Sequence, residues 1–209
     1  LLAASRIKSL SAVLASHTDE DHIGGLSQVL RAFDVEQLIL PVWMTAEVET
    51  VPLLRAARRR GVRVHPVARG SVVGLGSLRL AVLWPPAEDP PRHENERSLV
   101  TRLELGDGAA LVTSDIGKQT ENRFSLSASA RCDILVVPHH GSRGSSSEAF
   151  LDGSSPSIAL VPAAPGNTHG HPHREVLDRL WARGITTRVP MPDTACGARW
   201  DGERWAAYP

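Results

Sequence analysis

The chain has 209 residues, and its 23 Lys and Arg side chains balance 23 Asp and Glu side chains, which gives a net charge of zero. Hydrophobic residues make up 42% and charged residues 22%, proportions that are typical of a globular domain and exclude a disordered chain. The charge balance excludes a strongly basic nucleic-acid module, and no apolar run approaches the roughly 18 residues of a membrane span. The two cysteines, Cys132 and Cys196, are too few for a zinc ribbon or a disulfide scaffold.

Glycine and proline divide the first third of the chain into alternating apolar runs and amphipathic helical patterns. Strands are predicted at residues 11–16, 37–41 and 62–66. Helices are predicted at residues 25–33 and 46–60, and the second is expected to end at Gly61.

The pattern changes beyond residue 77, where three apolar runs predict antiparallel strands at 77–84, 98–105 and 109–113. Gly106-Asp107-Gly108 predicts the hairpin that joins the last two. The remaining predicted elements are helices at 118–129 and 172–183, strands at 133–137, 157–161 and 185–189, and a hairpin at 200–205. This order predicts one layered α/β domain with helices outside its sheets.

The first candidate site is the segment His17-Thr-Asp19-Glu-Asp21-His22, which follows a predicted strand and precedes a predicted helix. His17 and Asp19 are two residues apart in an extended segment and therefore point to the same side. Asp21 and His22 lie at the turn into the helix, so the four side chains can converge on one or two cations. The alternative is a polar loop with an N-capping aspartate, which leaves two histidines and a second acid unexplained.

Three later segments also place polar side chains at strand ends. Asp115 ends an apolar strand, although an aspartate there is often only a turn or cap residue. His139 and His140 follow a predicted strand and precede a loop rich in glycine and serine, a combination that offers a ligand, a proton donor and donors for an anion. The last segment is Asn167-Thr-His169-Gly-His171-Pro-His173, for which a helix cap and turn is the alternative.

These four segments, in this order, resemble the motifs of the metallo-β-lactamase superfamily, and more closely those of the domain that ends ComEC-type competence proteins. The matching stretches are His17-Thr-Asp-Glu-Asp-His22, Thr113-Ser-Asp115, Val137-Pro-His-His-Gly-Ser142 and Asn167-Thr-His-Gly-His-Pro-His173. The resemblance covers about residues 8–190. It implies a four-layer αββα sandwich with a metal site at the sheet edge.

On this resemblance, residues 1–209 are expected to form a single domain of α/β (α+β) class, a piece of a longer membrane protein. The domain itself is expected to be soluble and tethered to the bacterial cell membrane, with the membrane channel of the parent chain as a partner. Two departures from the family pattern are visible. His17 comes almost at once, so the first strands of the fold are expected to be lacking, and Asn95 stands near the place of a usual motif histidine.

The resemblance also implies a ligand set for two divalent metal ions. One position takes His17 and Asp19, the other takes Asp21, His22 and His139, and Asp115 is shared. Three carboxylates beside three imidazoles form a harder set than the histidine-rich sites that favour zinc, so manganese is favoured and zinc stays open. No nucleotide cofactor is expected.

The implied activity is phosphodiester hydrolysis, with one strand of DNA degraded during uptake. Asp21 is expected to orient water as well as to bind metal, and His140 or His171 to protonate the leaving oxygen. The side chains expected to bind substrate are Ser142, Arg143, Asn167 and His169. Two alternatives stay open: a metallohydrolase of a small ester, lactone or thioester, and a metal-poor interaction domain of a membrane DNA channel.

A basic stretch offers one way for a neutral protein to contact DNA. It contains Arg55, Arg58, Arg59, Arg60, Arg63 and Arg69, and no acidic residue occurs between positions 50 and 87. The alternative is a solvated helix face whose last arginines complement the helix dipole. The steep salt dependence of phosphate contacts separates the two interpretations.

Overall fold

A computed structural model describes residues 7–123, 128–191 and 196–208. The chain divides into two compact units, the first made of Leu1–Ser71 and Trp84–Leu99, the second of Val72–Leu83 and Val100–Pro209. None of the helices in the described part of the chain has the length and apolarity needed to cross a membrane.

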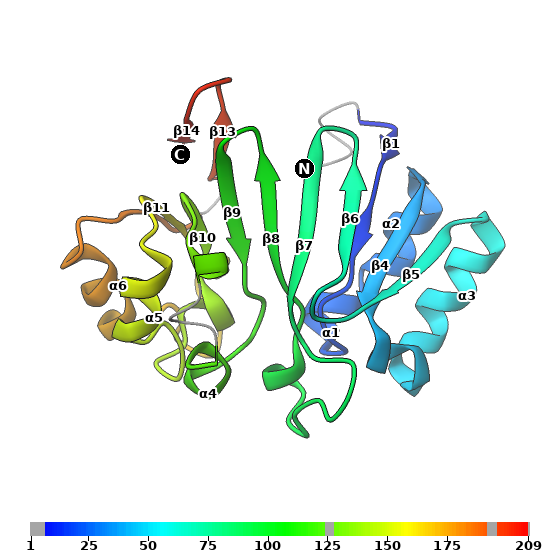
Figure 1. The fold of residues 1–209 in the computed structure, drawn as a ribbon. Coiled ribbons are helices and arrows are strands. Elements are labelled where there is room, and N and C mark those ends of the chain that lie inside the picture. The colour runs from blue at the N-terminus through cyan, green and yellow to red at the C-terminus, as the bar shows by residue number, and fades with distance from the viewer. Residues whose placement is uncertain (1–6, 124–127, 192–195, 209) are drawn as a thin grey trace. The chain divides into compact units, whose positions relative to one another are not determined.

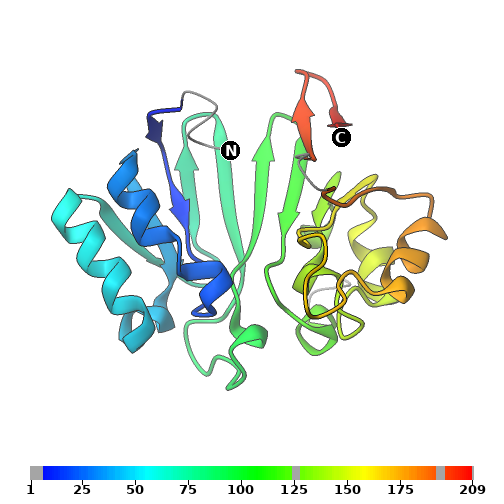
Figure 2. The same cartoon turned by 180° about the vertical axis from the view of Figure 1, so that it is seen from behind.

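The first unit is built on a parallel three-stranded sheet of order β2-β4-β5, and the short strands β1 and β3 pair beside each other. Helices α2 and α3 lie together on one face of this sheet (Figures 1 and 2). The elements are β1 (Ser9–Leu10), β2 (Val13–Leu14), α1 (Glu20–Ile23), α2 (Leu26–Ala32), β3 (Asp34–Val35), β4 (Gln37–Pro41), α3 (Val51–Arg60) and β5 (Arg63–Val67). The strand predicted at residues 11–16 is thus present but shorter.

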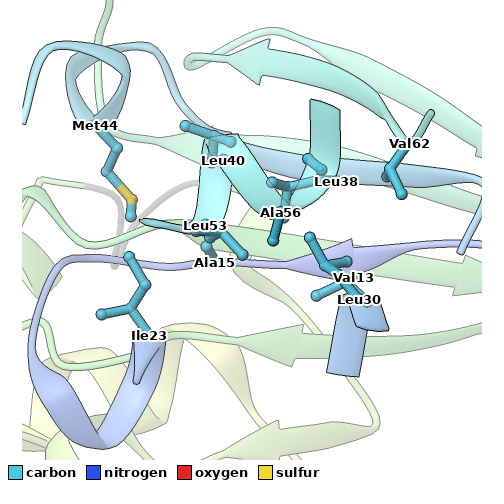
Figure 3. Packing of buried hydrophobic residues seen from close by; sticks show 11 residues of the cluster. Val13, Ala15, Ile23, Leu30, Leu38, Leu40, Met44, Leu53, Ala56 and Val62 are labelled. Carbon is cyan, nitrogen blue, oxygen red and sulfur yellow. The ribbon is translucent and has the colours of Figure 1, made fainter. Parts of the chain in front are cut away.

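The core of the first unit lies between this sheet and its two helices (Figure 3). Leu38 and Leu40 of β4 are fully buried against Leu30 of α2 and Leu53 of α3. All five residues of β4 are buried, as expected for a central parallel strand. This packing fixes the carboxyl end of β2, from which the first candidate site emerges.

The helix predicted at residues 46–60 begins later, at Val51. Two short 3-10 turns, Val42–Ala46 and Val48–Thr50, precede it. Pro52 explains the late start, because proline has no N–H to donate to the preceding turn and is tolerated only at the beginning of an α-helix. The predicted end is confirmed, since Gly61 caps the helix in the left-handed conformation with φ 68°.

The second unit is built on a seven-stranded sheet of order β12-β11-β10-β9-β8-β7-β6. Strands β6 to β7 and β8 to β9 pair antiparallel, whereas β9, β10, β11 and β12 pair in parallel. The strands are β6 (Val72–Leu75), β7 (Leu78–Trp84), β8 (Val100–Leu105), β9 (Gly108–Val112), β10 (Ile134–Val136), β11 (Ile158–Leu160) and β12 (Thr186–Arg188). Because β9, β10 and β11 are parallel neighbours, the loops after them emerge at the same edge of the sheet.

The described residues of the second unit also form three α-helices, two 3-10 helices and a hairpin. They are α4 (Lys118–Glu121), η5 (Ala128–Ala130), η6 (Pro138–Gly141), α5 (Glu148–Ser154), α6 (Arg174–Trp181) and the pair β13 (Gly197–Trp200) and β14 (Trp205–Tyr208). Helices α5 and α6 lie beside the parallel strands (Figure 1). The predicted hairpin at 200–205 and the helix within 172–183 are therefore confirmed.

Three elements of the second unit differ from prediction. The helix expected at 118–129 is only the four residues of α4, and part of its predicted span, 124–127, lies outside the described residues. Thr, Asn and Ser in this stretch compete for backbone hydrogen bonds and disfavour a longer helix. Strand β6 was not predicted because glycine interrupts its short apolar run. Helix α5 was not predicted because the serines before it suggested a loop, yet Ser147 accepts a hydrogen bond from Phe150 N–H as its N-cap.

Candidate metal centre

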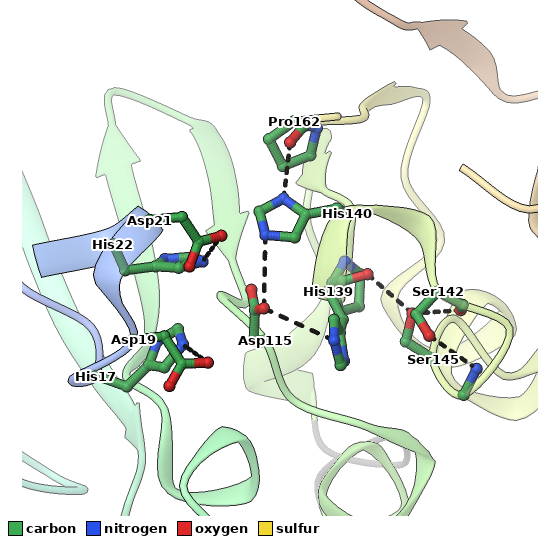
Figure 4. A network of polar contacts seen from close by, with 12 residues as sticks. His17, Asp19, Asp21, His22, Asp115, His139, His140, Ser142, Ser145 and Pro162 are labelled. Atoms are coloured by element: carbon green, nitrogen blue, oxygen red, sulfur yellow. Dashed lines mark hydrogen bonds and ion pairs between the residues drawn. The ribbon is translucent and has the colours of Figure 1, made fainter. Parts of the chain in front are cut away.

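The segment after β2 brings its two histidines and two aspartates together in matched pairs (Figure 4). His17 Nε2 lies 3.4 Å from Asp19 Oδ2, and His22 Nε2 lies 3.6 Å from Asp21 Oδ2. The two imidazole rings have centroids 4.2 Å apart. His17 is fully buried, whereas the carboxylate of Asp21 is largely exposed. Each ring therefore directs Nε2 toward a carboxylate oxygen.

Ser16 orients both rings of this segment. Its hydroxyl lies 3.0 Å from His17 Nδ1 and 3.3 Å from His22 Nδ1. A hydroxyl oxygen has two lone pairs and can accept an N–H from each ring. In that arrangement the lone pairs of both imidazoles are on Nε2, the atoms that face the carboxylates.

The capping alternative for this loop is not supported. Asp19 occupies the N-cap position of α1, but its carboxylate makes no capping hydrogen bond. Gly24 then lets the chain turn tightly, because a Cβ there would lie 2.7 Å from the carbonyl oxygen of Glu20. The loop therefore leaves the aspartate side chains directed toward the histidines and does not use them to cap the helix.

The second unit places Asp115 and two histidines at the ends of neighbouring strands (Figure 4). Asp115 follows β9 and is 5% exposed. Its Oδ2 lies 3.5 Å from His140 Nε2 and 3.9 Å from His139 Nε2. The hydrogen bond from Thr113 Oγ1 to the Val136 carbonyl, at 2.6 Å, joins the ends of β9 and β10 just before these residues.

The backbone around these residues is strained. Ser114, His139 and His140 have φ values of 50°, 49° and 53°, in the left-handed region that residues other than glycine adopt only at a cost. His139 N–H donates to the Ser114 carbonyl at 2.9 Å, which couples the two strained turns. Strain of this kind is concentrated at functional sites and persists where the surrounding structure enforces it.

The two histidines of this unit differ in orientation. His140 Nδ1 lies 2.7 Å from the Pro162 carbonyl oxygen, which can only accept, so the ring donates Nδ1–H there and presents Nε2 to Asp115. A histidine fixed through Nδ1 to a backbone carbonyl is the usual arrangement of a metal ligand. His139 is farther from Asp115, and its ring lies edge-on to His171 with centroids 5.8 Å apart.

The loop after β11 surrounds its histidines with a hydrogen-bond network centred on Asn167. The Asn167 amide donates to the carbonyls of Ala164 and His171, at 2.8 and 2.6 Å, and its oxygen accepts from the N–H groups of His169 and His171. The side chain expected to bind substrate is thus engaged within its own loop. The geometry supports a positioning role, since the network holds His171 in place.

The remaining residues expected to bind substrate are more accessible. Arg143 is 68% exposed in its side chain and forms a weak ion pair with Glu175 at 3.8 Å. Ser142 Oγ accepts from Gly144 N–H at 3.3 Å, and His169 is exposed at the tip of its loop. Of these three, Arg143 offers the charged group that an anionic substrate requires.

The donor atoms fit divalent cations. Two ligands held about 2.1 Å from one cation are about 3.0–3.4 Å apart in octahedral or tetrahedral geometry. The His17–Asp19, His22–Asp21 and His140–Asp115 pairs, at 3.4–3.6 Å, lie near that separation and are too long for good hydrogen bonds. Bound cations would supply electrophilic stabilisation of a substrate oxygen and activation of water.

Burial lowers the pKa of His171, and the neighbouring His173, His139, His140 and His169 lower it further. The neutral ring is therefore favoured near pH 7. In the expected role of proton donor, His171 would have to gain its proton from the reaction, whereas as a neutral ring it can accept one.

An acid-lined cavity of about 510 Å³ lies in the first unit beside Asp19. Glu20, Glu49 and Glu94 contribute carboxylates to its wall. The pKa of Glu94 is raised, first by burial and then by the negative charge of Asp19. This cavity is unfavourable for an anionic group and suits a neutral or cationic one.

His173, which the last candidate segment included, accepts through Nδ1 from the Arg143 backbone N–H at 3.3 Å. Several other contributing residues were not predicted. Ser16 and the Pro162 carbonyl orient histidines. The buried Glu121 accepts hydrogen bonds from Ser146 and Ser147 N–H and holds the loop after His140. Only Ser16 had a visible signal, its place directly before the first histidine motif.

The family model described as the metallo-beta-lactamase superfamily matches residues 2–164. The chain therefore belongs to this superfamily. The fold agrees: a CmlA beta-hydroxylase mutant structure, from a protein of Streptomyces venezuelae, has a TM-score of 0.63 at 13% identity, covering 90% of this chain and 44% of that one. The predicted fold class is confirmed, and the prediction of a single domain stays a prediction.

The curated relatives confirm the resemblance to ComEC-type competence proteins. ComE operon protein 3 of Bacillus subtilis is 36% identical over 88% of this chain and 24% of its own length. Recombination protein 2 of Haemophilus influenzae is 28% identical over 82% of this chain and 20% of its own length. Competence protein ComA of Neisseria gonorrhoeae is 34% identical over 48% of this chain and 15% of its own length. The chain thus spans about a quarter or less of the length of these relatives.

Proposed function

We propose that this chain is a two-metal phosphodiesterase that degrades one strand of DNA during DNA uptake by a membrane competence protein. The observation that carries the proposal is the set of three carboxylate–imidazole pairs at 3.4–3.6 Å, in a chain whose relatives include competence proteins. Equal numbers of aspartates and histidines favour manganese over zinc. A two-metal site suits phosphodiester hydrolysis because it stabilises both the attacking and the leaving oxygen.

We assign His17, Asp19, Asp21, His22 and Asp115 as metal ligands, in two positions that share Asp115. The orientation of His140 through the Pro162 carbonyl supports this histidine as a further ligand, in place of His139. His139 and His171, whose rings are in edge contact, then remain for proton transfer. Neutral His171 would take up the proton that the attacking water loses and pass it to the leaving oxygen.

Asp21 is proposed to orient the attacking water, because its carboxylate is largely exposed and lies beside His22 Nε2 at 3.6 Å. Arg143, Ser142 and His169 are proposed to contact the phosphate, with Arg143 supplying the positive charge. Asn167 is proposed to act by holding His171, through the hydrogen bonds of its loop.

The acid-lined cavity beside Asp19 favours a second candidate, a hydrolase of a small neutral or cationic ester or lactone. Four carboxylates around about 510 Å³ would repel a phosphodiester from that space. In the first proposal the DNA strand has to avoid this cavity, whereas in the second the cavity receives the substrate.

Metal content and hydrolysis measured on the same preparation test the proposal. The purified chain is assayed before and after manganese addition against single-stranded DNA, duplex DNA and uncharged p-nitrophenyl esters, with Asp21→Ala and His140→Ala as variants. Manganese-dependent DNA cleavage lost in both variants is expected. Ester hydrolysis without DNA cleavage would favour the second candidate, and absence of bound metal would contradict both.

A further inference from the structure

The outer face of α3 carries a group of arginines that the proposed active site does not use. We call Arg55, Arg58 and Arg59 the arginine face. All three are exposed. Among the described residues they have no acidic partner, whereas the neighbouring Arg60 pairs with Asp34 at 3.5 Å.

The packing of α3 explains why these side chains point outward together. Leu53, Ala56 and Ala57 are buried on the side that meets the sheet. At about 100° per residue, Arg55, Arg58 and Arg59 fall within an arc of about 100° on the opposite side. They span only about 6 Å of the helix axis, so the helix presents a compact positive surface.

The helix dipole accounts for only part of this arrangement. Arg58, Arg59 and Arg60 are in the last turn, where positive charge is favourable. Arg55 lies a turn earlier, where the dipole gives no such advantage. Like charges three and four residues apart repel one another on a helix, so a solvated face gains nothing from having them adjacent.

We propose that the arginine face binds the phosphate backbone of DNA and holds the strand for the hydrolase. This inference rests on the proposed function. A polyanion fits because DNA carries about one charge per 3.4 Å along a strand and per 1.7 Å of duplex axis, which places about two to four phosphate charges along the length that the α3 arginines span. Guanidinium groups bind phosphate oxygens in bidentate fashion.

An anionic membrane is a less suitable partner for this surface. Membrane-surface helices combine basic residues with exposed apolar side chains that enter the lipid. Helix α3 exposes no large hydrophobic side chain, and Val64 of β5 is the one large exposed hydrophobic residue beside the arginine face among the described residues. The chemistry therefore favours phosphates in solution over a lipid surface.

The test compares two triple variants that lose the same charge. R55Q/R58Q/R59Q removes the α3 arginines, and the control R79Q/R174Q/R204Q removes exposed arginines of the second unit that are ion-paired to Glu104, Asp178 and Asp201. Binding to a labelled 30-nucleotide strand is followed by fluorescence anisotropy in EDTA from 50 to 200 mM NaCl. Thermal unfolding verifies that each variant is folded.

The α3 variant is expected to bind at least tenfold more weakly at 50 mM NaCl, with a salt slope smaller by about 2, whereas the control changes less than threefold. Equal changes in both variants, or no change in the α3 variant, would overturn the proposal. So would wild-type protein that binds phosphatidylglycerol vesicles through these arginines but does not bind DNA.

Hydrolysis of bis(p-nitrophenyl) phosphate with manganese separates this result from the proposed function. None of the α3 arginines is among the residues proposed to bind metal or the phosphate at the active site, so the α3 variant is expected to hydrolyse this small substrate at the wild-type rate. Loss of DNA binding with this rate retained supports the arginine face. Absence of small-diester hydrolysis in wild type would count against the proposed function. The DNA-binding measurement, made in EDTA, would still test the arginine face.

Discussion

The two units supply their candidate ligands in different ways. In the first unit, four donor side chains come from six consecutive residues, and the hydroxyl of Ser16 orients both histidines. In the second unit, Asp115 and His140 follow different strands, and a backbone carbonyl from a third loop, at Pro162, orients the histidine.

The backbone conformation at the candidate ligands also differs between the two units. The second unit holds Ser114, His139 and His140 in left-handed conformations, whereas none of the described residues of the first unit's loop, 16–22, has a positive φ. A local motif can direct its side chains within ordinary backbone geometry. A site assembled from separate strands needs tight turns at each strand end, and the sheet must compensate their strain.

The largest expected effect tests whether the two sets act as one site. Asp19→Ala and Asp115→Ala are each expected to lower kcat/KM for manganese-dependent hydrolysis by about 10³-fold or more, and the double variant to be no worse than either. The readout is steady-state hydrolysis of bis(p-nitrophenyl) phosphate, with the exposed Asp107→Ala as control. Multiplicative losses in the double variant would show that the units act independently.

The next comparison is between the adjacent histidines of the second unit. His140→Ala is expected to weaken manganese affinity by about 100-fold or more, and His139→Ala by about tenfold or less, because only His140 is fixed through Nδ1 to a carbonyl. Isothermal titration calorimetry measures both affinities. A larger loss of manganese affinity in His139→Ala than in His140→Ala would favour His139 as the ligand.

The orienting hydroxyl of the first unit can be removed by mutation, unlike the carbonyl of the second. Ser16→Ala is expected to weaken metal affinity by about 10–100-fold, since both imidazoles lose the partner of Nδ1. Ser16→Thr, which keeps the hydroxyl, is the matched control. Equal losses in the two variants would mean that packing at this position matters and the hydrogen bonds do not.

A smaller effect is expected from Glu121, which supports the loop after His140. Burial raises the pKa of this carboxyl above its usual 4.5, against the lowering effect of the Ser146 and Ser147 hydrogen bonds. Because the folded state then binds the proton more tightly, this stabilisation is full below the unfolded pKa and is lost as the pH rises through the folded pKa.

Glu121→Gln cannot ionise and removes this dependence, and its single amide oxygen can accept from only one of the two N–H groups. The stability advantage of wild type over the variant is therefore expected to shrink between pH 5 and pH 8, as measured by urea unfolding. Glu121→Ala, which leaves two N–H groups without their acceptor, is expected to cost about 2–4 kcal/mol at either pH. An advantage that grows with pH would mean that the carboxylate is the favoured folded form.

The smallest expected effect concerns the thiols. Burial raises the pKa of Cys132 to about 12, so this side chain is expected to be unreactive toward Ellman's reagent at pH 8 in the folded protein. Cys196 is only partly buried and is expected to react. Titration of two thiols before unfolding would show that the second unit opens around Cys132.

Much of the fold was visible in the sequence because its signals are local. Apolar runs bounded by glycine and proline predicted β4, β9, β10 and β11, and Gly61 predicted the end of α3. Helix α4 is shorter than predicted, and strand β6 was not predicted. The extent of such short elements depends on tertiary contacts, such as those of the buried Glu121 in α4.

The sequence by itself determined the chemistry of the candidate site. His17, Asp19, Asp21 and His22 stand so close together that any ordered loop keeps them near one another, and their residue types define the ligands. The role of Asn167 depends on the turn of its own loop, whose hydrogen-bond partners lie within four residues of it. Tertiary structure decided the role of His140, which is oriented by a carbonyl 22 residues away, because hydrogen bonds form between groups that are close in space.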